Sequence, residues 1–498
     1  MRAKVKLENF LNSKLYPLAM IIITFLFWVF QDKNSTTIQT LTIVAFSFYI
    51  VLITLFLIFF KDNLYMMFTA MCALFVIGVS HYSALNVTFF EKYPFIYLLI
   101  IIIVIAFVYH IIKYKVKLKM HALGLSFVFI AIGYIAALRL NSNALNNLGT
   151  YIIQTLVGPV YLFLYLFFVN TIEKKSLKIF MYMFFMICLL VTAQFLAEYL
   201  RLTIYSLRHV EGISNVFDAI KLGIKSKWEI GGQRIELGYD NVNGAAMYIG
   251  FLLPTTVYLA YKSKQKLLYF AAFITCAVAG LLSLSRGAYI SIGISSFLSV
   301  VLVLIYFDKN SKILLISGLA AISIIILIIP GLISSVVDRF IFMATKDDGD
   351  IWNGRLILYE MAVQQFERNP LFGSGFFGAI DSPVTIANRA VVYHSTFFHA
   401  VGTMGYFGLG ALIYHLSKVA LLIKKKVSLP VLFLLIGILA THVHGLIDNT
   451  FYMFIYMFIT IIIYVAIEKG TKVESDNPIF NKEYHMETAE DNLNYKLS

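Results

Sequence analysis

The chain has 498 residues, of which 60% are hydrophobic and only 13% are charged. Soluble domains carry roughly a quarter of their residues as charged side chains, so this composition excludes an ordinary soluble protein. The formal net charge of +13 does not indicate a nucleic-acid-binding face, because the lysines gather in short loops between apolar runs, as is typical of membrane proteins. We therefore expect an all-α polytopic membrane protein.

The apolar runs are close to the ~20 residues that a helix needs to cross a bilayer. The first run, 15–30, follows a basic stretch and is not followed by the small residues of a signal-peptide cleavage site, so we interpret it as a retained span. Further runs follow at about 38–60, 64–83, 93–112, 120–140, 150–170, 177–200, 243–261, 266–284, 288–306, 312–333, 397–422, 429–447 and 450–467. These runs predict about 12–14 transmembrane helices.

Lysine and arginine fall on opposite sides of this predicted topology. The side that both termini share holds the loop lysines Lys61, Lys113, Lys115, Lys117, Lys119, Lys174, Lys175, Lys178, Lys262, Lys264, Lys266, Lys309, Lys312, Lys424, Lys425 and Lys426. That side is predicted to be cytoplasmic. Every arginine except Arg2 falls on the other side: Arg139, Arg201, Arg208, Arg234, Arg286, Arg339, Arg355, Arg368 and Arg389. The guanidinium group binds phosphate in a bidentate manner, so this distribution favours an outward-facing site for a group such as a lipid diphosphate; interfacial anchoring is the alternative.

The spans and loops divide the chain into six regions. We predict an N-terminal bundle at 1–200, an extracytoplasmic loop at 201–242, central helices at 243–333, a large extracytoplasmic loop at 334–396, C-terminal helices at 397–467 and a disordered cytoplasmic tail at 468–498. The spans hold almost no ionisable residues, with Glu198 and Asp448 near span ends, and no internal repeat is evident. Both features disfavour an ion-coupled carrier. The cysteines Cys72, Cys188 and Cys276 stand singly in apolar runs and predict neither disulfides nor a metal site.

Two arginine motifs precede or join predicted spans. Residues 231–244, G-G-Q-R-I-E-L-G-Y-D-N-V-N-G, predict a tight turn with Asn243 as the N-cap of the next helix and Arg234 near that helix terminus. Helix N-termini favour anions, although a capped loop with a solvated arginine explains the motif as well. Residues 283–288, S-L-S-R-G-A, predict a very tight outer hairpin in which Arg286 either faces a cavity or anchors at the interface.

The large outer loop contains a predicted helix and a glycine-rich bend. Leu356, Tyr359, Val363 and Phe366 recur at helical spacing, which predicts an amphipathic helix with Arg355 in its first turn and its end at 369–370. Residues 372–378, F-G-S-G-F-F-G, follow and predict a flexible bend. No strand precedes this bend, which excludes a dinucleotide-binding loop.

A histidine motif, Y-H-S-T at 393–396, stands at the start of the next span. Ser395 is the expected N-cap, which places His394 at the mouth of the membrane domain. Histidine is a common general base, and the alternative is a polar residue that closes a helix start. His399 is expected to serve packing. His442, His444 and Asp448 can approach the same cavity but lack the spacing of a metal site.

In this order the four motifs resemble the O-antigen ligase and O-antigen polymerase family of membrane glycan transferases. The resemblance covers about 234–410 and consists of R-x3-G-x4-N before a span, S-x-S-R-G-A between two spans, P-L-F-G-x-G in a large outer loop and H-S-x6-G-x2-G at the next span. The chain departs from the common pattern at Ser395, where many members have asparagine, and at 240–243, where many have Asn-Pro-Asn.

The resemblance implies metal-independent, inverting glycosyl transfer without a cofactor, on a fold of the membrane glycosyltransferase C type. It implies His394 and Arg286 as catalytic residues, and Arg234, Arg355 and Asn243 as substrate-binding residues. The donor would be an undecaprenyl-diphosphate-linked oligosaccharide and the acceptor a glycan or lipid, in the inner membrane of a bacterium with the active site outside. Flippase and chain-length regulator proteins are possible partners, and no nucleic acid is expected.

Three functions are compatible with these residues. The first is a polymerase of lipid-linked repeat units, which the Lys-, Ile- and Phe-rich composition, typical of an AT-rich bacterium, favours. The second is a ligase that transfers finished glycan to lipid A core or another acceptor. The third, from another class, is a lipid-linked oligosaccharide flippase, for which we expect cations at the bundle midplane and short outer loops, the reverse of what this chain shows. A purely structural assembly protein is a further alternative.

Overall fold

The computed structural model describes residues 2–11, 13–30, 36–61, 65–80, 95–138, 148–172, 175–225, 229–230, 233–234, 242–283, 285–328, 334, 355–375, 393–452 and 454–471. Over these residues the protein is α-helical apart from two pairs of two-residue strands. The prediction of an all-α polytopic protein is therefore confirmed.

Every predicted apolar run forms a helix. In the N-terminal part these are α2 (Leu15–Val29), α3 (Thr36–Phe59), α4 (Tyr65–Ser80), α6 (Phe95–Lys113), α7 (Gly124–Ala136), α9 (Leu148–Thr171) and α10 (Leu177–His209). The remaining ones are α12 (Val242–Ala260), α13 (Lys266–Leu281), α14 (Arg286–Tyr306), α15 (Lys309–Ile328), α18 (Thr396–Lys425), α19 (Leu429–His444) and α20 (Phe454–Lys469). Within the described part of the chain α10, α14 and α18 are long and apolar enough to cross a membrane on their own, and shorter apolar helices accompany them.

The other elements lie at the ends of these helices. They are α1 (Arg2–Leu11), α11 (Val216–Lys225), α17 (Arg355–Arg368), the parallel pair β1 (Lys175–Ser176) and β4 (Gly470–Thr471), and the antiparallel pair β2 (Glu229–Ile230) and β3 (Gln233–Arg234). Helix α10 continues beyond position 200 to His209, so part of the predicted first outer loop is an extension of a spanning helix.

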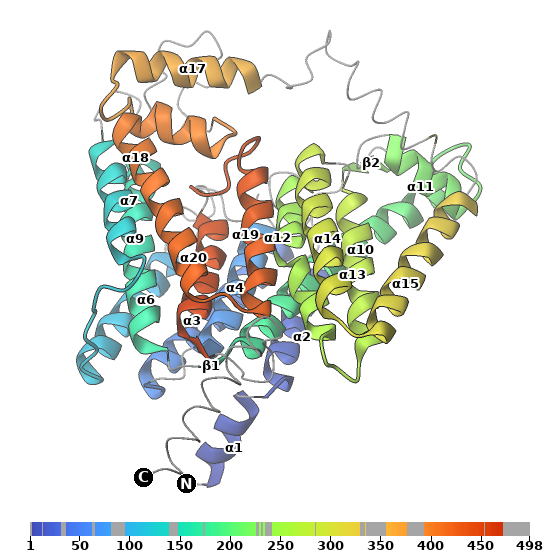
Figure 1. Cartoon of the computed structure of the whole chain (residues 1–498), viewed down its shortest axis with the longest axis horizontal. Helices are drawn as coiled ribbons and strands as arrows, with labels where there is room; N and C mark the ends of the chain where they lie inside the picture. The colour runs from blue at the N-terminus through green and yellow to red at the C-terminus, as the bar shows by residue number, and fades with distance from the viewer. Residues whose placement is uncertain are drawn as a thin grey trace, which may run out of the picture.

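The helices stand side by side in one bundle, with different elements at its two ends (Figure 1). Helix α17 lies across one end, and α1 and β1 lie at the opposite end. Helices α14 and α18 begin at the α17 end and run away from it. Lys309 and Lys312 at the start of α15 and Lys424 in the last turn of α18 therefore lie at the far end. These three lysines thus lie at the end of the bundle opposite α17.

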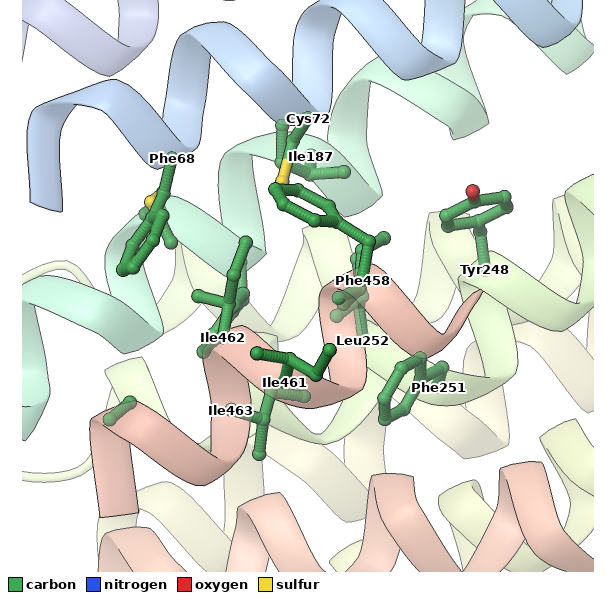
Figure 2. Packing of buried hydrophobic residues seen from close by; sticks show 14 of the residues in the cluster. Phe68, Cys72, Ile187, Tyr248, Phe251, Leu252, Phe458, Ile461, Ile462 and Ile463 are labelled. Atoms are coloured by element: carbon green, nitrogen blue, oxygen red, sulfur yellow. The ribbon is translucent and has the colours of Figure 1, made fainter. Parts of the chain in front are cut away.

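Helix α20 forms the centre of the core. It is apolar on all sides, and a helix of that kind is stable only when neighbours cover it completely. Phe458, Ile461 and Ile462 are fully buried and lie among side chains of α4, α10 and α12 (Figure 2). At its far end the Glu468 carboxylate accepts hydrogen bonds from Tyr165 Oη (2.6 Å) and from the backbone N–H of Ala122 (3.2 Å), which joins α20 to α9 and to the segment before α7.

Small residues bring α12, α14 and α19 into close contact. A Cβ atom on Gly250 of α12 would lie 2.8 Å from Ser291 Oγ, and one on Gly437 of α19 would lie 2.1 Å from the carbonyl oxygen of Phe251. Ser295 Oγ donates a hydrogen bond to the carbonyl of Gly250. Small and hydroxyl-bearing residues commonly allow membrane helices to approach in this way. The approach brings the N-terminus of α14 against the C-terminus of α19.

Candidate active site

His394 and Asp448 form a hydrogen-bonded pair at the α17 end of the bundle. Nδ1 of His394 lies 3.1 Å from Oδ1 of Asp448, and the two side chains are 41% and 16% exposed. The backbone of His394 is left-handed, with φ of 47°, a conformation that non-glycine residues adopt uncommonly. An acidic partner at Nδ1 fixes the imidazole and leaves Nε2 as the nitrogen that can accept a proton.

The residues after His394 attach the start of α18 to the turn that follows α19. Ser395 caps α18, as predicted, by accepting the backbone N–H of Phe398 (3.5 Å). Thr396 donates its N–H to the carbonyl of Gly445 (2.7 Å). The hydroxyl of Thr396 in turn accepts the N–H groups of residues 450 and 451 (3.3 and 3.4 Å). The motif H-S-T thus places the histidine and fixes the segment that carries its acidic partner.

The turn after α19 holds Asp448 in place through its backbone. The N–H of Asp448 donates to the carbonyl of His444 (3.0 Å), and the N–H of Asn449 donates to Asp448 Oδ1 (2.9 Å). Burial raises the pKa of this carboxyl. The hydrogen bond with His394 and the electrostatic influence of His444, His394 and Arg355 outweigh burial and hold the pKa below its usual value. Asp448 is therefore a carboxylate.

Helix α17 covers the pair from outside. The ring of Tyr359 stacks on that of Phe398, with centroids 4.2 Å apart and planes at 11°, and its hydroxyl donates to the carbonyl of His394 (3.3 Å). Arg355 is the first residue of this helix and is half-buried. Its charge acts on the pKa of both Tyr359 and Asp448. The structure thus brings Arg355 close to the pair formed by His394 and Asp448.

The predicted helix in the large loop is confirmed, but only part of its predicted apolar stripe is buried: Tyr359 and Phe366 pack against rings of α18. Leu356 and Val363 are 46% and 41% exposed, whereas Ala362 is fully buried. A Cβ atom on Gly402 of α18 would lie only 3.1 Å from the Cα of Ala362. The close approach of α17 to α18 at this point requires small residues, which turns Leu356 and Val363 away from α18.

The glycine-rich bend completes a break in α18. At Gly405 the helix has φ of 63° and ψ of −153°, so the N–H groups of Tyr406 and Phe407 cannot bond four residues back. They donate instead to the carbonyls at positions 370 and 371 (2.8 and 3.0 Å). The freed carbonyls of residues 402 and 403 accept the N–H groups of Ser374 and Gly375 (3.1 and 3.0 Å). The P-L-F-G-S-G segment therefore replaces the missing turn of the helix.

The expected flexibility of residues 372–375 is thus wrong. Gly373 has φ of 64°, and a Cβ atom there would lie 2.4 Å from the backbone of Thr403; a Cβ atom on Gly405 would lie 2.4 Å from the carbonyl oxygen of Pro370. These glycines allow two backbones to touch, and the bend is a fixed part of the α18 start. Residues 376–378 lie outside the described residues.

The S-x-S-R-G-A motif begins α14 on the other side of Asp448. Ser285 is the N-cap and accepts the N–H of Ala288 (3.3 Å), which makes Arg286 the first residue of the helix. A Cβ atom on Gly287 would lie 2.6 Å from Nε2 of His444. The start of α14 therefore lies against the turn that carries Asp448. The side chain of Arg286 lies outside the described part of the structure.

For the two remaining predicted site residues, Arg234 and Asn243, the structure describes only the backbone. Arg234 is in β3, and Asn243 is in the first turn of α12. Because α12 begins at Val242, Asn243 is not the N-cap that the motif predicted. The side chains of both residues, and residues 235–241 between them, lie outside the described residues.

His399 and His442 do not hydrogen-bond to His394 or Asp448 in the described part of the structure. His399 is buried between the rings of Tyr393 and Tyr452 (centroid distances 6.1 and 5.1 Å), which confirms its packing role. His442 lies next to Phe451. In the part of the chain that the structure describes, no group of three or more His, Cys, Asp or Glu side chains is arranged to hold a metal ion.

The role of Asp448 is only weakly indicated by the sequence. It is an acidic residue in an apolar C-terminal turn, 54 residues from the histidine that it binds. Its isolation among apolar residues was the only available indication of a functional position.

Comparison with known proteins adds one finding. Residues 271–413 match the family model described as O-antigen ligase. The matched region extends from α13 into α18 and contains Arg286, Arg355 and His394. No curated protein sequence matches the chain.

Proposed function

Because residues 271–413 match the O-antigen ligase family model, we propose that this membrane protein transfers glycan from a lipid diphosphate. The specific reaction is the joining of undecaprenyl-diphosphate-linked oligosaccharide repeat units into a cell-surface polysaccharide. The observation that carries this proposal is the hydrogen-bonded pair of His394 and Asp448 at the mouth of the helical bundle, next to the N-terminus of α14.

In this proposal His394 is the general base. Nε2 takes the proton of an acceptor hydroxyl while the hydroxyl oxygen forms a bond to the anomeric carbon of the donor. The bond between that carbon and the diphosphate oxygen breaks, and the lipid diphosphate leaves with the electron pair on the opposite face, which inverts the anomeric centre. Asp448, held as a carboxylate, orients the imidazole and stabilises the imidazolium that forms. General bases of this kind typically contribute about 10²- to 10⁴-fold in rate.

The leaving group requires stabilisation of its developing negative charge. Arg286, Arg355 and Arg234 are the cations proposed for the diphosphate, with Asn243 as an additional substrate-binding residue. The free N–H groups at the start of α14 add a positive helix terminus. Fixed cations in a low-dielectric site stabilise such charge strongly because they need no reorganisation during the reaction, and for this reason we propose transfer without a metal.

The site is proposed to face the outside of a bacterial inner membrane. This orientation is supported by the loop lysines, which lie at the end of the bundle opposite His394 and α17. The positive-inside rule assigns that lysine-rich end to the cytoplasm. The proposed donor and a glycan or lipid acceptor then meet at the outer membrane surface.

The test uses the purified full-length protein in liposomes with undecaprenyl-diphosphate oligosaccharide, with products resolved by size. A ladder of repeats that is absent with His394→Ala is the expected result. Transfer only after addition of a lipid A core acceptor would instead identify a ligase. Movement of the donor across the bilayer without any transfer would contradict the enzyme proposal and support a flippase.

A further inference from the structure

His444 lies at the junction of two parts of the site without belonging to either. It is the last residue of α19, is 1% exposed, and lies outside the region that matches the family. On one side its ring faces the start of α14. On the other side its backbone carries the turn that contains Asp448.

The contact with α14 is made by the Nε2 side of the imidazole. A Cβ atom on Gly287 would lie 2.6 Å from Nε2, 2.7 Å from Cε1 and 3.2 Å from Cδ2 of His444. Three ring atoms thus occupy the space that a side chain at this position would need. Gly287 directly follows Arg286, so the ring determines how closely the N-terminus of α14 approaches the turn.

The contact with the Asp448 turn is made by the backbone. The carbonyl oxygen of His444 accepts the N–H groups of Ile447 and Asp448, both at 3.0 Å. Any displacement of His444 therefore displaces Asp448, and with it the partner of His394 Nδ1.

The ring is also held from the side. Nδ1 of His444 lies 3.4 Å from the hydroxyl of Ser291, one turn further along α14, and Ser291 itself packs against Gly250 of α12. The tight packing of α12, α14 and α19 leaves the imidazole one position. It is a rigid spacer between two helices and the turn.

We propose that His444 is a positioning residue that sets the separation between the Arg286 end of α14 and the pair of His394 and Asp448. This inference rests on the proposed function, in which those two parts act on opposite faces of the anomeric carbon. An error of about 1 Å in such an arrangement can reduce a rate about 10²-fold. The position of a residue that touches no substrate thereby determines the rate of the chemical step.

The test is a double-variant cycle in the full-length protein reconstituted in liposomes. Gly287→Ala places a methyl group against the ring and is expected to reduce kcat about 100-fold while KM for the donor changes much less. His444→Ala removes the spacer and should reduce kcat about tenfold. The double variant should exceed Gly287→Ala in kcat, because the truncated side chain makes room for the methyl group.

Gly293→Ala is the matched control. Gly293 is on the same helix, and a Cβ atom there would meet no atom within 4 Å, so kcat should stay at the wild-type value. Ser291→Ala is a second, milder variant in case Gly287→Ala does not fold. It releases the ring from its lateral partner and should lower kcat without a matching loss of thermal stability.

Two results would overturn the inference. The first is that the double variant has a kcat no higher than that of Gly287→Ala. The second is that the variants lose thermal stability but keep the wild-type kcat, as expected if His444 only packs. A second readout needs no catalysis. It is the increase in melting temperature that undecaprenyl diphosphate produces in the wild type and in each variant. If the wild type transfers no glycan, the proposed function fails. The role of His444 is then still decided by whether the double variant has a larger ligand-induced thermal shift than Gly287→Ala.

Discussion

At the scale of single residues, Asp448 determines what His394 can do. Its carboxylate lies 3.1 Å from Nδ1, so Nε2 is the ring nitrogen that can accept a proton. The hydroxyl of Tyr359 and the cap at Ser395 fix the backbone around the histidine. A histidine that only closed a helix start would need no acidic partner, and for this reason the pair favours the general-base interpretation.

Replacement of Asp448 by asparagine should reduce transfer about 10²- to 10⁴-fold in kcat. An amide at this position neither stabilises an imidazolium nor enforces the tautomer with the proton on Nδ1. The measurement is the initial rate of product formation at saturating donor in liposomes. Wild-type kcat in Asp448→Asn protein would show that the pair has no part in the reaction.

The same carboxyl predicts a pH dependence of stability. The pKa of Asp448 is lower in the folded protein than its ordinary value of 3.8, so its stabilising contribution is fully present above that value. The contribution is lost as the pH falls from there through the folded pKa. Thermal unfolding in detergent should therefore separate wild type from Asp448→Asn at pH 6, with the difference shrinking below about pH 4. A difference that grows with acidification would contradict this assignment.

At the scale of elements, the break in α18 aligns the start of that helix with α17. The bend at 370–375 makes four backbone hydrogen bonds, one to each donor or acceptor that the break at Gly405 frees in α18. A membrane helix can break in this way only where other groups satisfy its backbone. The first part of α18, which follows His394 directly, is thereby held independently of the part that crosses the bundle.

The substitution Gly405→Ala should destabilise the protein by about 2 kcal/mol or more, because its backbone conformation is essentially restricted to glycine. A Cβ atom would also lie 2.4 Å from the carbonyl oxygen of Pro370. Gly410→Ala on the same helix is the control, since a Cβ atom there meets nothing within 4 Å. Equal melting temperatures for the two variants in detergent would argue against the described break.

The sequence predicts elements well where one physical requirement dominates. Each apolar run forms a helix because the bilayer requires it, and the cap at Ser395 is visible from local chemistry alone. The role of the F-G-S-G bend could not be predicted, because its partner is a helix break about thirty residues later that the sequence marks only by a glycine. Only part of the predicted stripe packs as expected: Tyr359 stacks on Phe398 of α18, whereas Leu356 and Val363 are exposed because the closest contact with α18 is made by the small residue Ala362.

The site is also hard to predict where it depends on contacts between residues far apart in the sequence. His394 could be selected from the motif around it, whereas its link to Asp448 depends on how α18 meets the end of α19. Gly287 shows the same limit: it is an ordinary small residue in sequence, and only the fold places the His444 ring against it.

At the scale of the whole molecule, the bundle has two chemically different ends. One end holds α17, His394 and Asp448, and the other holds the strand pair β1 and β4 and the loop lysines. This polarity underlies the proposed orientation, in which the site faces outward and the lysines face the cytoplasm.

The orientation predicts accessibility to a membrane-impermeant maleimide. The native cysteines Cys72, Cys188 and Cys276 are buried and free, so they give little background. Gln364→Cys on α17 should be labelled in intact cells, and Lys117→Cys in the lysine-rich loop only after permeabilisation; both positions are exposed. Labelling of Lys117→Cys alone in intact cells would reverse the proposed orientation.

The most direct test of the whole account compares wild-type and His394→Ala protein in liposomes with bound undecaprenyl-diphosphate oligosaccharide. Donor binding and glycan transfer are measured on the same preparation. The account predicts that His394→Ala binds the donor as wild type does, since the histidine acts on the acceptor hydroxyl, and that its transfer rate falls at least about 10²-fold. Transfer by His394→Ala at the wild-type rate would contradict the central claim that His394, oriented by Asp448, is the base of a glycan transferase.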